Sequence, residues 1–308
     1  MTRTSLGAGA LALSLCASLG LASCGTVPAS AATVDGSDIT RKDFERDLRA
    51  LAANPGLLSL TGGTEASIEG EAARGWLSQL ITWKAAENLL AAHGLEPSSE
   101  AVDSITAQLD ANEAAKRLPQ AMKDEVVRGA ASMDSLALVP APSAEELGAQ
   151  YAVSPALTGA LCARHILLDT EEEAKAVLAE LDRGADFAEL AKERSTEPAA
   201  AQTGGALGGD DGNACLPVGT YQTQFDPDFT AGALAAQVGT PTQPVKSQFG
   251  WHVILLRPYD EVAGDLATLV SSAPGDAALT GALATAEIDV DRRYGRWDQA
   301  AGNVVSLR

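Results

Sequence analysis

The chain is poor in basic residues, in histidine and cysteine, and in aromatic side chains. Its 308 residues include 22 Lys and Arg against 41 Asp and Glu, which gives a formal net charge of −19. Binding to nucleic acid or electrostatic docking on an anionic bilayer needs a basic face, so this balance disfavours both. With 3 His and 4 Cys, a rich metal site is also disfavoured, and we expect neither a metal nor another cofactor.

Motifs of several functional classes are missing as well. The sequence has no Gly-x-Ser-x-Gly motif, and the glycine-rich stretch 204–209 lacks the Lys-Ser/Thr and the helix start of a phosphate-binding loop. A substrate-binding lipoprotein of a transporter would need two α/β lobes, and only one small α+β pattern is visible. The hydrophobic fraction of 46% is too high for a disordered chain, and the length predicts roughly two domains.

The N-terminus has the features of an export signal. Arg3 precedes an apolar run from Leu6 to Leu21, which is too short for a comfortable transmembrane helix. The run ends in Leu21-Ala22-Ser23-Cys24, which resembles a bacterial lipobox. We therefore expect residues 1–23 to be a lipoprotein signal peptide and Cys24 to be the lipid anchor. The alternative is an ordinary signal peptide cut near residues 29–32, with Cys24 discarded.

Two cysteines with free sulfur remain in the exported chain besides the expected lipid anchor Cys24. Cys16 lies in the apolar run, so Cys162 and Cys215 are the pair left with free sulfur. Outside the cytoplasm such a pair is expected to form a disulfide. The alternative is two unrelated buried thiols.

The apolar periodicity divides the exported chain into segments. Residues 24–35 are expected to be a tether, although Thr33–Gly36 also has the pattern of a short strand and turn. Residues 36–160 show helical spacing with capping signals, for example Thr40 with Asp43. The alternation in Ile288–Asp291 predicts an edge strand in the last segment, and this strand is a candidate to pair with Thr33–Gly36.

Residues 161–259 have a different order of elements: a strand, two helices, a glycine-rich turn with a strand, a third helix and two final strands. Several of their motifs resemble the parvulin-type peptidyl-prolyl cis/trans isomerase domain at matching spacing. These motifs are ARHILL, DFAELAKERSTEP, GGALG and FDPDFTAGALAAQVGTPTQPVKSQFGWHVILL. The resemblance implies a four-stranded antiparallel sheet with surrounding helices.

The stretch from Asp35 to Phe44 is similar to the start of SurA/PrsA-like helical domains, although this match is shorter. In such proteins the parvulin domain is inserted in a mostly helical chaperone domain. The resemblance therefore implies an α+β chain in which residues 36–160 form the N-terminal helical domain and residues 260–308 return to it.

The parvulin resemblance assigns site residues. It implies catalytic roles for a histidine pair with a neighbouring hydroxyl and a carboxylate, namely His165, His252, Ser247 and Glu197. It implies a hydrophobic proline pocket formed by Phe225, Phe229 and Leu207, with Leu234 behind them. Glu197 stands where the family has Asp or Cys, Ala206 replaces an Asp, and Leu234 replaces an aromatic residue.

The implied function is that of a foldase anchored at the extracytoplasmic face of the membrane through the lipid on Cys24. Its partners would be unfolded or nascent secreted polypeptides with X–Pro bonds, and it would use a non-covalent mechanism without a metal. The alternative, left open by the three departures from the family pattern, is a holdase whose parvulin domain binds peptide without significant isomerase activity.

Overall fold

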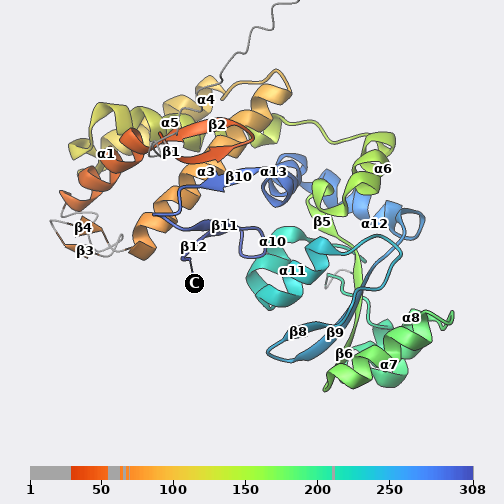
Figure 1. Ribbon diagram of the computed structural model, residues 1–308. Helices are drawn as coiled ribbons and strands as arrows, with labels where there is room; N and C mark the ends of the chain where they lie inside the picture. Colours follow the sequence, from red (N-terminus) through yellow and green to blue (C-terminus); the bar gives the residue numbers. More distant parts are fainter. Residues whose placement is uncertain (1–28, 55–62, 65–66, 69, 210–211, 308) are drawn as a thin grey trace, which may run out of the picture.

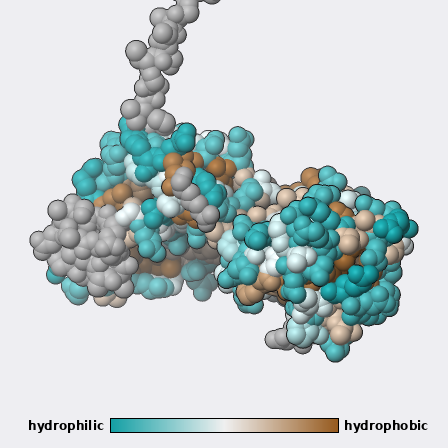
Figure 2. All heavy atoms as spheres, turned by 60° about the horizontal axis from the view of Figure 1, so that its bottom comes forward, coloured by the Kyte–Doolittle hydropathy of each residue, from teal (hydrophilic) through white to brown (hydrophobic). Residues whose placement is uncertain are grey.

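The computed structural model describes residues 29–54, 63–64, 67–68, 70–209 and 212–307. The predicted signal peptide and Cys24 lie outside these residues. The described chain forms two lobes, a helical unit and a smaller α+β unit, joined by a neck (Figures 1 and 2). Among the residues described, no helix combines the length and the hydrophobicity needed to cross a bilayer.

The helical unit contains segments from both ends of the chain. Its long central helix, α3, buries Leu77, Ile81 and Leu90 in the largest apolar cluster. Its elements are β1 (Ser30–Val34), β2 (Ser37–Thr40), α1 (Arg41–Ala52), β3 (Gly63–Thr64), β4 (Ser67–Ile68), α3 (Gly70–Ala92), α4 (Ser99–Ala111), η1 (Ala115–Arg117), α5 (Gln120–Asp134), η2 (Ser135–Leu138), α13 (Pro274–Thr285), β10 (Ile288–Val290), β11 (Arg296–Asp298) and β12 (Asn303–Val305).

The predicted pairing between the two ends is confirmed. β1 lies between β2 and β10 in a three-stranded sheet, and Thr33 pairs with Asp289 in antiparallel register. The predicted tether of residues 24–35 is too long, because Ser30–Val34 is a strand in which Ala31 and Val34 are fully buried. The small side chains that suggest a tether instead allow β1 to pack closely on α3.

A buried cluster of charged residues joins α1 to α5. Asp47 is fully buried and accepts hydrogen bonds from Arg46 and, at 3.4 Å, from Trp76 Nε1. Arg46 Nη2 also lies 3.0 Å from Glu125 Oε2. The same guanidinium also pairs with Asp43 Oδ1 at 2.6 Å, so one arginine contacts three carboxylates in this cluster. Burial and the nearby Asp47 raise the pKa of Glu125 to about 7.

Glu125→Gln should stabilise the protein above pH 7 and have little effect near pH 5. The pKa of Glu125 is about 7 in the folded protein and 4.5 as its ordinary value, so folding favours the protonated side chain. The stability this provides is complete below pH 4.5 and is lost as the pH rises through about 7. Gln resembles the protonated form at every pH, so the variant does not suffer this loss. We expect a gain of about 1 kcal/mol at pH 8, measured by urea unfolding. Glu113→Gln, at a position 82% exposed, is the matched control. An equal effect of both variants, or a gain at pH 5 only, would contradict the interpretation.

The neck is formed where the chain enters and leaves the α+β unit. Helices α6 (Ala144–Val153) and α12 (Tyr259–Ser272) pack against each other there, and a capping box of Ser143 and Glu146 begins α6. Two short segments, η3 (Pro155–Thr158) and β5 (Ala160–Leu161), continue into the α+β unit. The neck has its own apolar cluster, which includes Leu147, Tyr151, Cys162, Cys215, Val262 and Leu266.

The α+β unit is built on an antiparallel sheet of order β6-β9-β8. Its elements are β6 (Ala163–Leu168), α7 (Glu171–Leu181), α8 (Phe187–Arg194), α9 (Ala200–Thr203), β7 (Leu216–Pro217), α10 (Val218–Gln224), α11 (Pro227–Ala235), β8 (Val245–Ser247) and β9 (Gly250–Leu256). One face packs on α7 and α8, and the other on α11. The unit therefore has two apolar layers, one on each side of the sheet.

The predicted fourth strand of this sheet is reduced to a single bridge. Ala206 bridges Arg164, Gly205 O accepts the N–H of His165 at 2.8 Å, and Leu207 N donates to Ala163 O at 2.9 Å. The glycine-rich stretch thus lies beside β6 but is too short and too bent to form a strand. Gly205 has a φ of +76°, and a Cβ at this position would lie 2.2 Å from His165 O. Glycine is required there because any side chain would push the stretch away from β6.

Candidate active site

Two histidines face the same side of the sheet. His252 on β9 pairs with Leu167, and His165 on β6 pairs with Ile254, so all four side chains project from one face. Both imidazoles are buried, with 5% and 4% of the residue exposed for His165 and His252. The periodicity of two in each strand places the histidines in one layer beneath α11.

The histidines belong to a continuous hydrogen-bonded network. His165 Nδ1 lies 3.1 Å from His252 Nδ1, and His252 Nε2 lies 2.8 Å from Ser247 Oγ. The backbone N–H of Phe249 donates to Ser247 Oγ at 3.1 Å, and Glu197 contacts His165 Nε2. The network begins at the β8–β9 turn and ends at a carboxylate on the opposite wall.

The network assigns a proton to each ring. Because Ser247 Oγ accepts from Phe249, its own hydrogen is available to His252 Nε2. His252 then carries its proton on Nδ1 and donates to His165 Nδ1, which leaves the proton of His165 on Nε2, facing Glu197. With both rings neutral, each bridging ring nitrogen of the pair faces a complementary group, and His165 Nε2 faces the Glu197 carboxylate.

Burial and neighbouring groups set the ionisation of His252 and Glu197. Burial, and secondly the neighbouring His165, lower the pKa of His252 to about 4. The hydrogen bond from His165 lowers the pKa of Glu197, against the opposing effect of burial. At neutral pH the site therefore contains an uncharged His252 and an ionised Glu197.

Glu197 is positioned by the segment that follows α8. Thr196 N donates to Leu167 O at 2.8 Å, and Ser195 Oγ accepts the N–H of Leu167 at 3.1 Å. These bonds hold the segment along the free edge of β6 near its end. The carboxylate is consequently directed at the histidine layer. Although Glu is one methylene longer than the Asp of the resembling family, its carboxylate contacts His165 Nε2.

An aromatic wall faces the network. The rings of Phe225 and Phe229 stack with centroids 5.5 Å apart, and Phe229 packs edge-on to His252 at 4.9 Å. Asp226 caps α11 and Pro227 occupies its first turn, so the helix begins between the two phenylalanines and presents both to the sheet. The arrangement leaves a hollow of about 280 Å³, a size suited to one small ring rather than to an extended ligand.

The hollow brings together most of the predicted residues but not all. It is lined by His165, Leu167, Thr196, Glu197, Pro198, Gln224, Phe225, Asp226, Phe229, Phe249 and His252. Ser247 is buried behind His252. Leu207 and Leu234 pack against the apolar cluster under α11, and neither lines the hollow. Leu234 lines a different hollow, together with Trp297 of the C-terminal segment.

The sequence analysis did not predict that Asp226 and Phe249 line the hollow, although a carboxylate and an exposed ring can both contact a ligand. Asp226 belongs to the quoted FDPDF motif, where its signal is that of a helix cap. Phe249 belongs to the SQFGWH motif, where it has the pattern of a turn residue and is 66% exposed. Neither pattern indicates a site, because the walls of the hollow meet only in the folded sheet.

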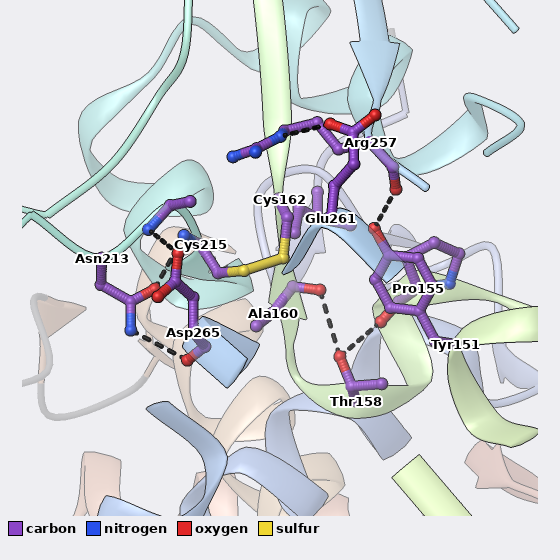
Figure 3. The surroundings of a disulfide bond; sticks show 12 residues. Tyr151, Pro155, Thr158, Ala160, Cys162, Asn213, Cys215, Arg257, Glu261 and Asp265 are labelled. Atoms are coloured by element: carbon purple, nitrogen blue, oxygen red, sulfur yellow. Dashed lines mark hydrogen bonds and ion pairs between the residues drawn. A yellow bond between two sulfur atoms is a disulfide. The ribbon is translucent and has the colours of Figure 1, made fainter. Parts of the chain in front are cut away.

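The cysteine pair lies at the neck end of the same sheet. Cys162 and Cys215 are joined by a disulfide, and both are buried (Figure 3). The loop that carries Cys215 is also held by α12, because Asn213 Nδ2 donates to Asp265 O at 2.9 Å and Ala214 N donates to Asp265 Oδ2 at 3.1 Å. The disulfide therefore fastens this loop to the residue before β6, and the bonds to Asp265 fasten the same loop to α12.

Comparison with known proteins identifies this part of the chain. Residues 165–258 match the Rotamase family, described as the PPIC-type PPIASE domain. A "Foldase protein PrsA" of Clostridium kluyveri is 47% identical over 90 residues, which cover 29% of this chain and 24% of that relative. Another, from Clostridium tetani, is 43% identical over 100 residues, covering 32% and 26%. The chain thus matches about a quarter of the length of these curated relatives.

A solved structure is similar over a larger part of the chain at lower identity. PrsA from Bacillus subtilis is 21% identical, with 83% of this chain and 92% of that chain covered and a TM-score of 0.29. The sequence matches and the buried histidine layer concern the same segment. The segment that holds the buried histidine layer, residues 165–258, is therefore the one that matches the PPIC-type peptidyl-prolyl isomerase domain and is similar to PrsA foldases.

Proposed function

We propose that this protein is a lipid-anchored extracytoplasmic foldase that catalyses cis/trans isomerisation of X–Pro bonds in unfolded or nascent secreted polypeptides. The observation that carries the proposal is the buried network of His165, His252 and Ser247, which faces an aromatic hollow within a PPIC-type domain. The anchoring part rests on the lipobox pattern at Cys24, outside the described residues. The buried disulfide agrees with an oxidising compartment.

The chemistry requires the amide to twist, and no covalent bond has to break. Rotation about the X–Pro bond must overcome a barrier of about 18–20 kcal/mol that arises from amide resonance. A site accelerates it by binding the twisted amide more tightly than either planar isomer. Phe225 and Phe229 hold the proline ring and exclude water, which removes the solvent hydrogen bonds that favour the planar form.

The polar wall supplies fixed dipoles for the twisted state. As the amide twists, its charge distribution changes, and pre-oriented groups that need no reorganisation stabilise the new distribution. Ser247 and His252 hold His165 in one orientation, and Glu197 keeps the His165 proton on Nε2, at the edge of the hollow. In this proposal His165 and Glu197 are the polar groups closest to the reacting amide. The mechanism uses neither a nucleophile nor a metal.

The test is the rate of exchange between the cis and trans signals of a short Ala-Leu-Pro-Phe peptide, measured by NMR without a coupled protease. We expect the purified chain to accelerate exchange. The double variant His165→Ala/His252→Ala should lose about 100-fold or more of kcat/KM, which corresponds to about 2.7 kcal/mol of transition-state stabilisation. Equal rates for the wild type, the double variant and the peptide alone would overturn the isomerase proposal.

A holdase function is the second candidate, and the helical unit offers an observation in its favour. A hollow of about 710 Å³ lies between α4 and α5, outside the isomerase domain, and Val102, Leu109 and Val127 contribute apolar surface to it. The same double variant separates the two functions. If it loses isomerase activity but still suppresses aggregation of an unfolded client, measured by light scattering, the holdase function belongs to the chain independently of the histidines.

A further inference from the structure

The hollow of the candidate active site has acidic walls. Glu197 and Asp226 line it, and no Lys or Arg is among the described residues that do. Glu197 contacts a histidine, but the hydrogen bonds of Asp226 come from uncharged backbone donors. Its two oxygens accept the N–H of Asp228 at 2.9 Å and the N–H of Gln248 at 3.3 Å. These bonds orient the carboxylate of Asp226, but their donors are uncharged and do not neutralise it.

The histidines do not neutralise both carboxylates. The contact of 3.1 Å between His165 Nδ1 and His252 Nδ1 has room for one hydrogen, so the two rings cannot both be fully protonated. Burial also lowers the pKa of His252 to about 4. Even with a cationic His165 against Glu197, the charge of Asp226 leaves the hollow negative. A ligand group of positive charge is therefore favoured there, and one of negative charge is repelled.

An exposed aromatic ring stands at the same hollow. Phe249 lines it with 66% of the residue exposed. Its backbone is fixed, because its N–H donates to Ser247 Oγ and the next residue, Gly250, has a φ of +143° beside Leu168 O. A phenyl face next to a carboxylate suits a lysine or arginine, whose methylene stem packs on the ring while the cation approaches the acid.

The nearby edge of the sheet adds negative charge. The Phe249–Gly250 turn touches the end of β6 at Leu168, since a Cβ on Gly250 would lie 2.4 Å from Leu168 O. The exposed residues Asp169 and Glu172 follow directly along the chain. At an ionic strength of about 0.01 M, charges interact over about 30 Å, so these carboxylates attract basic peptides and repel acidic ones on approach.

We propose that this site selects X–Pro bonds flanked by a lysine or arginine, whose cation lies at Asp226 and whose stem packs on Phe249. The proposal rests on the isomerase function proposed above and names the substrate class of that site. Peptides with an acidic residue next to the proline are the disfavoured class, because they place like charges together.

The test compares peptides that differ only in the residue before or after the proline, with Lys, Leu or Glu at each position. Exchange NMR gives kcat/KM without a protease. We expect the lysine peptide to exceed the glutamate peptide by about 10-fold at low salt at one of the two positions. The ratio should fall to about 2–3-fold in about 0.5 M NaCl, because the charges are solvent-accessible.

Two matched Asp→Asn variants locate the effect. Asp226→Asn keeps the cap of α11, since Asn is an equally good N-cap residue. It should reduce the lysine-to-glutamate ratio by about 3–5-fold. Asp186→Asn is the control: Asp186 caps α8 in the same domain, accepting from Glu189 N at 2.9 Å, and it does not line the hollow. This control should keep the ratio of the wild type.

The outcomes separate the two proposals. Acceleration of the leucine peptide without a preference for lysine over glutamate overturns the selectivity and leaves the isomerase function standing. No acceleration of any peptide overturns the isomerase function itself. An equal loss of selectivity in Asp226→Asn and Asp186→Asn also overturns the site proposal, because the effect would then follow the net charge of the domain.

Discussion

Replacing Cys162 and Cys215 together by alanine is expected to lower the free energy of unfolding by about 4 kcal/mol. The two residues are 53 positions apart, and in the chain-entropy model a closed loop of that length restricts the unfolded chain by this amount. The measurement is urea unfolding of the wild type and the variant, each with and without a reductant. The wild type should become as unstable as the variant when it is reduced, and the variant should not respond to the reductant.

The structural reason for a large effect is that the disulfide lies in the core of the neck. Both half-cystines pack with Leu147, Val262 and Leu266 in one apolar cluster. Without the bond, the loop of Asn213 retains its hydrogen bonds to Asp265, but its anchor to β6 is lost. Hydrogen exchange of residues 212–217 should therefore accelerate first. An unchanged midpoint, together with two more free thiols in the oxidised wild type than in the variant, would contradict the disulfide.

Phe229→Ala is expected to cost about 3–5 kcal/mol of stability and to remove most isomerase activity. Phe229 is 2% exposed and packs against His165, His252 and Phe225. Removal of a buried phenyl ring leaves a cavity in addition to the lost transfer energy. The same cavity opens the hollow to water and releases His165 from its fixed orientation. The measurements are the unfolding midpoint and the rate of cis/trans exchange under conditions where the variant is folded.

Phe249→Ala is the matched control for the stability effect. It makes the same chemical change at a position 66% exposed, so its unfolding free energy should stay within about 0.5 kcal/mol of the wild type. Equal destabilisation by the two substitutions would show that α11 does not cover the sheet as described. A stable Phe229→Ala protein with full activity would show that the aromatic wall takes no part in catalysis.

Local elements of the fold could be predicted because their signals lie within a few residues. The capping boxes at Ser143 and Thr170 begin helices in the structure as the sequence indicates. The strand of His165 is apolar and short, and it occupies the predicted position. The pairing of β1 with β10 was also accessible, since Ile288–Asp291 alternates and the first segment has a matching pattern.

Other features could not be predicted because they depend on contacts between distant segments. The glycine-rich turn was expected to lead into a strand, but the close approach of Gly205 to His165 O leaves only one bridge there. Ser30–Val34 has the small, uncharged composition of a tether, and only the proximity of α3 turns it into a buried strand. Composition is the same for a linker and for a closely packed strand, so it cannot distinguish them.

Capping signals and short apolar patterns are local, so most helices and strands of the α+β unit could be predicted from the sequence. The class of the unit and the roles of the two histidines came from motifs that resemble the parvulin domain. That Asp226 and Phe249 share a hollow with Glu197, and that Leu207 and Leu234 do not, emerges in the folded protein. The physical reason is that the residues lining a hollow come from segments far apart in the chain. Which of them meet depends on how those segments pack against the sheet.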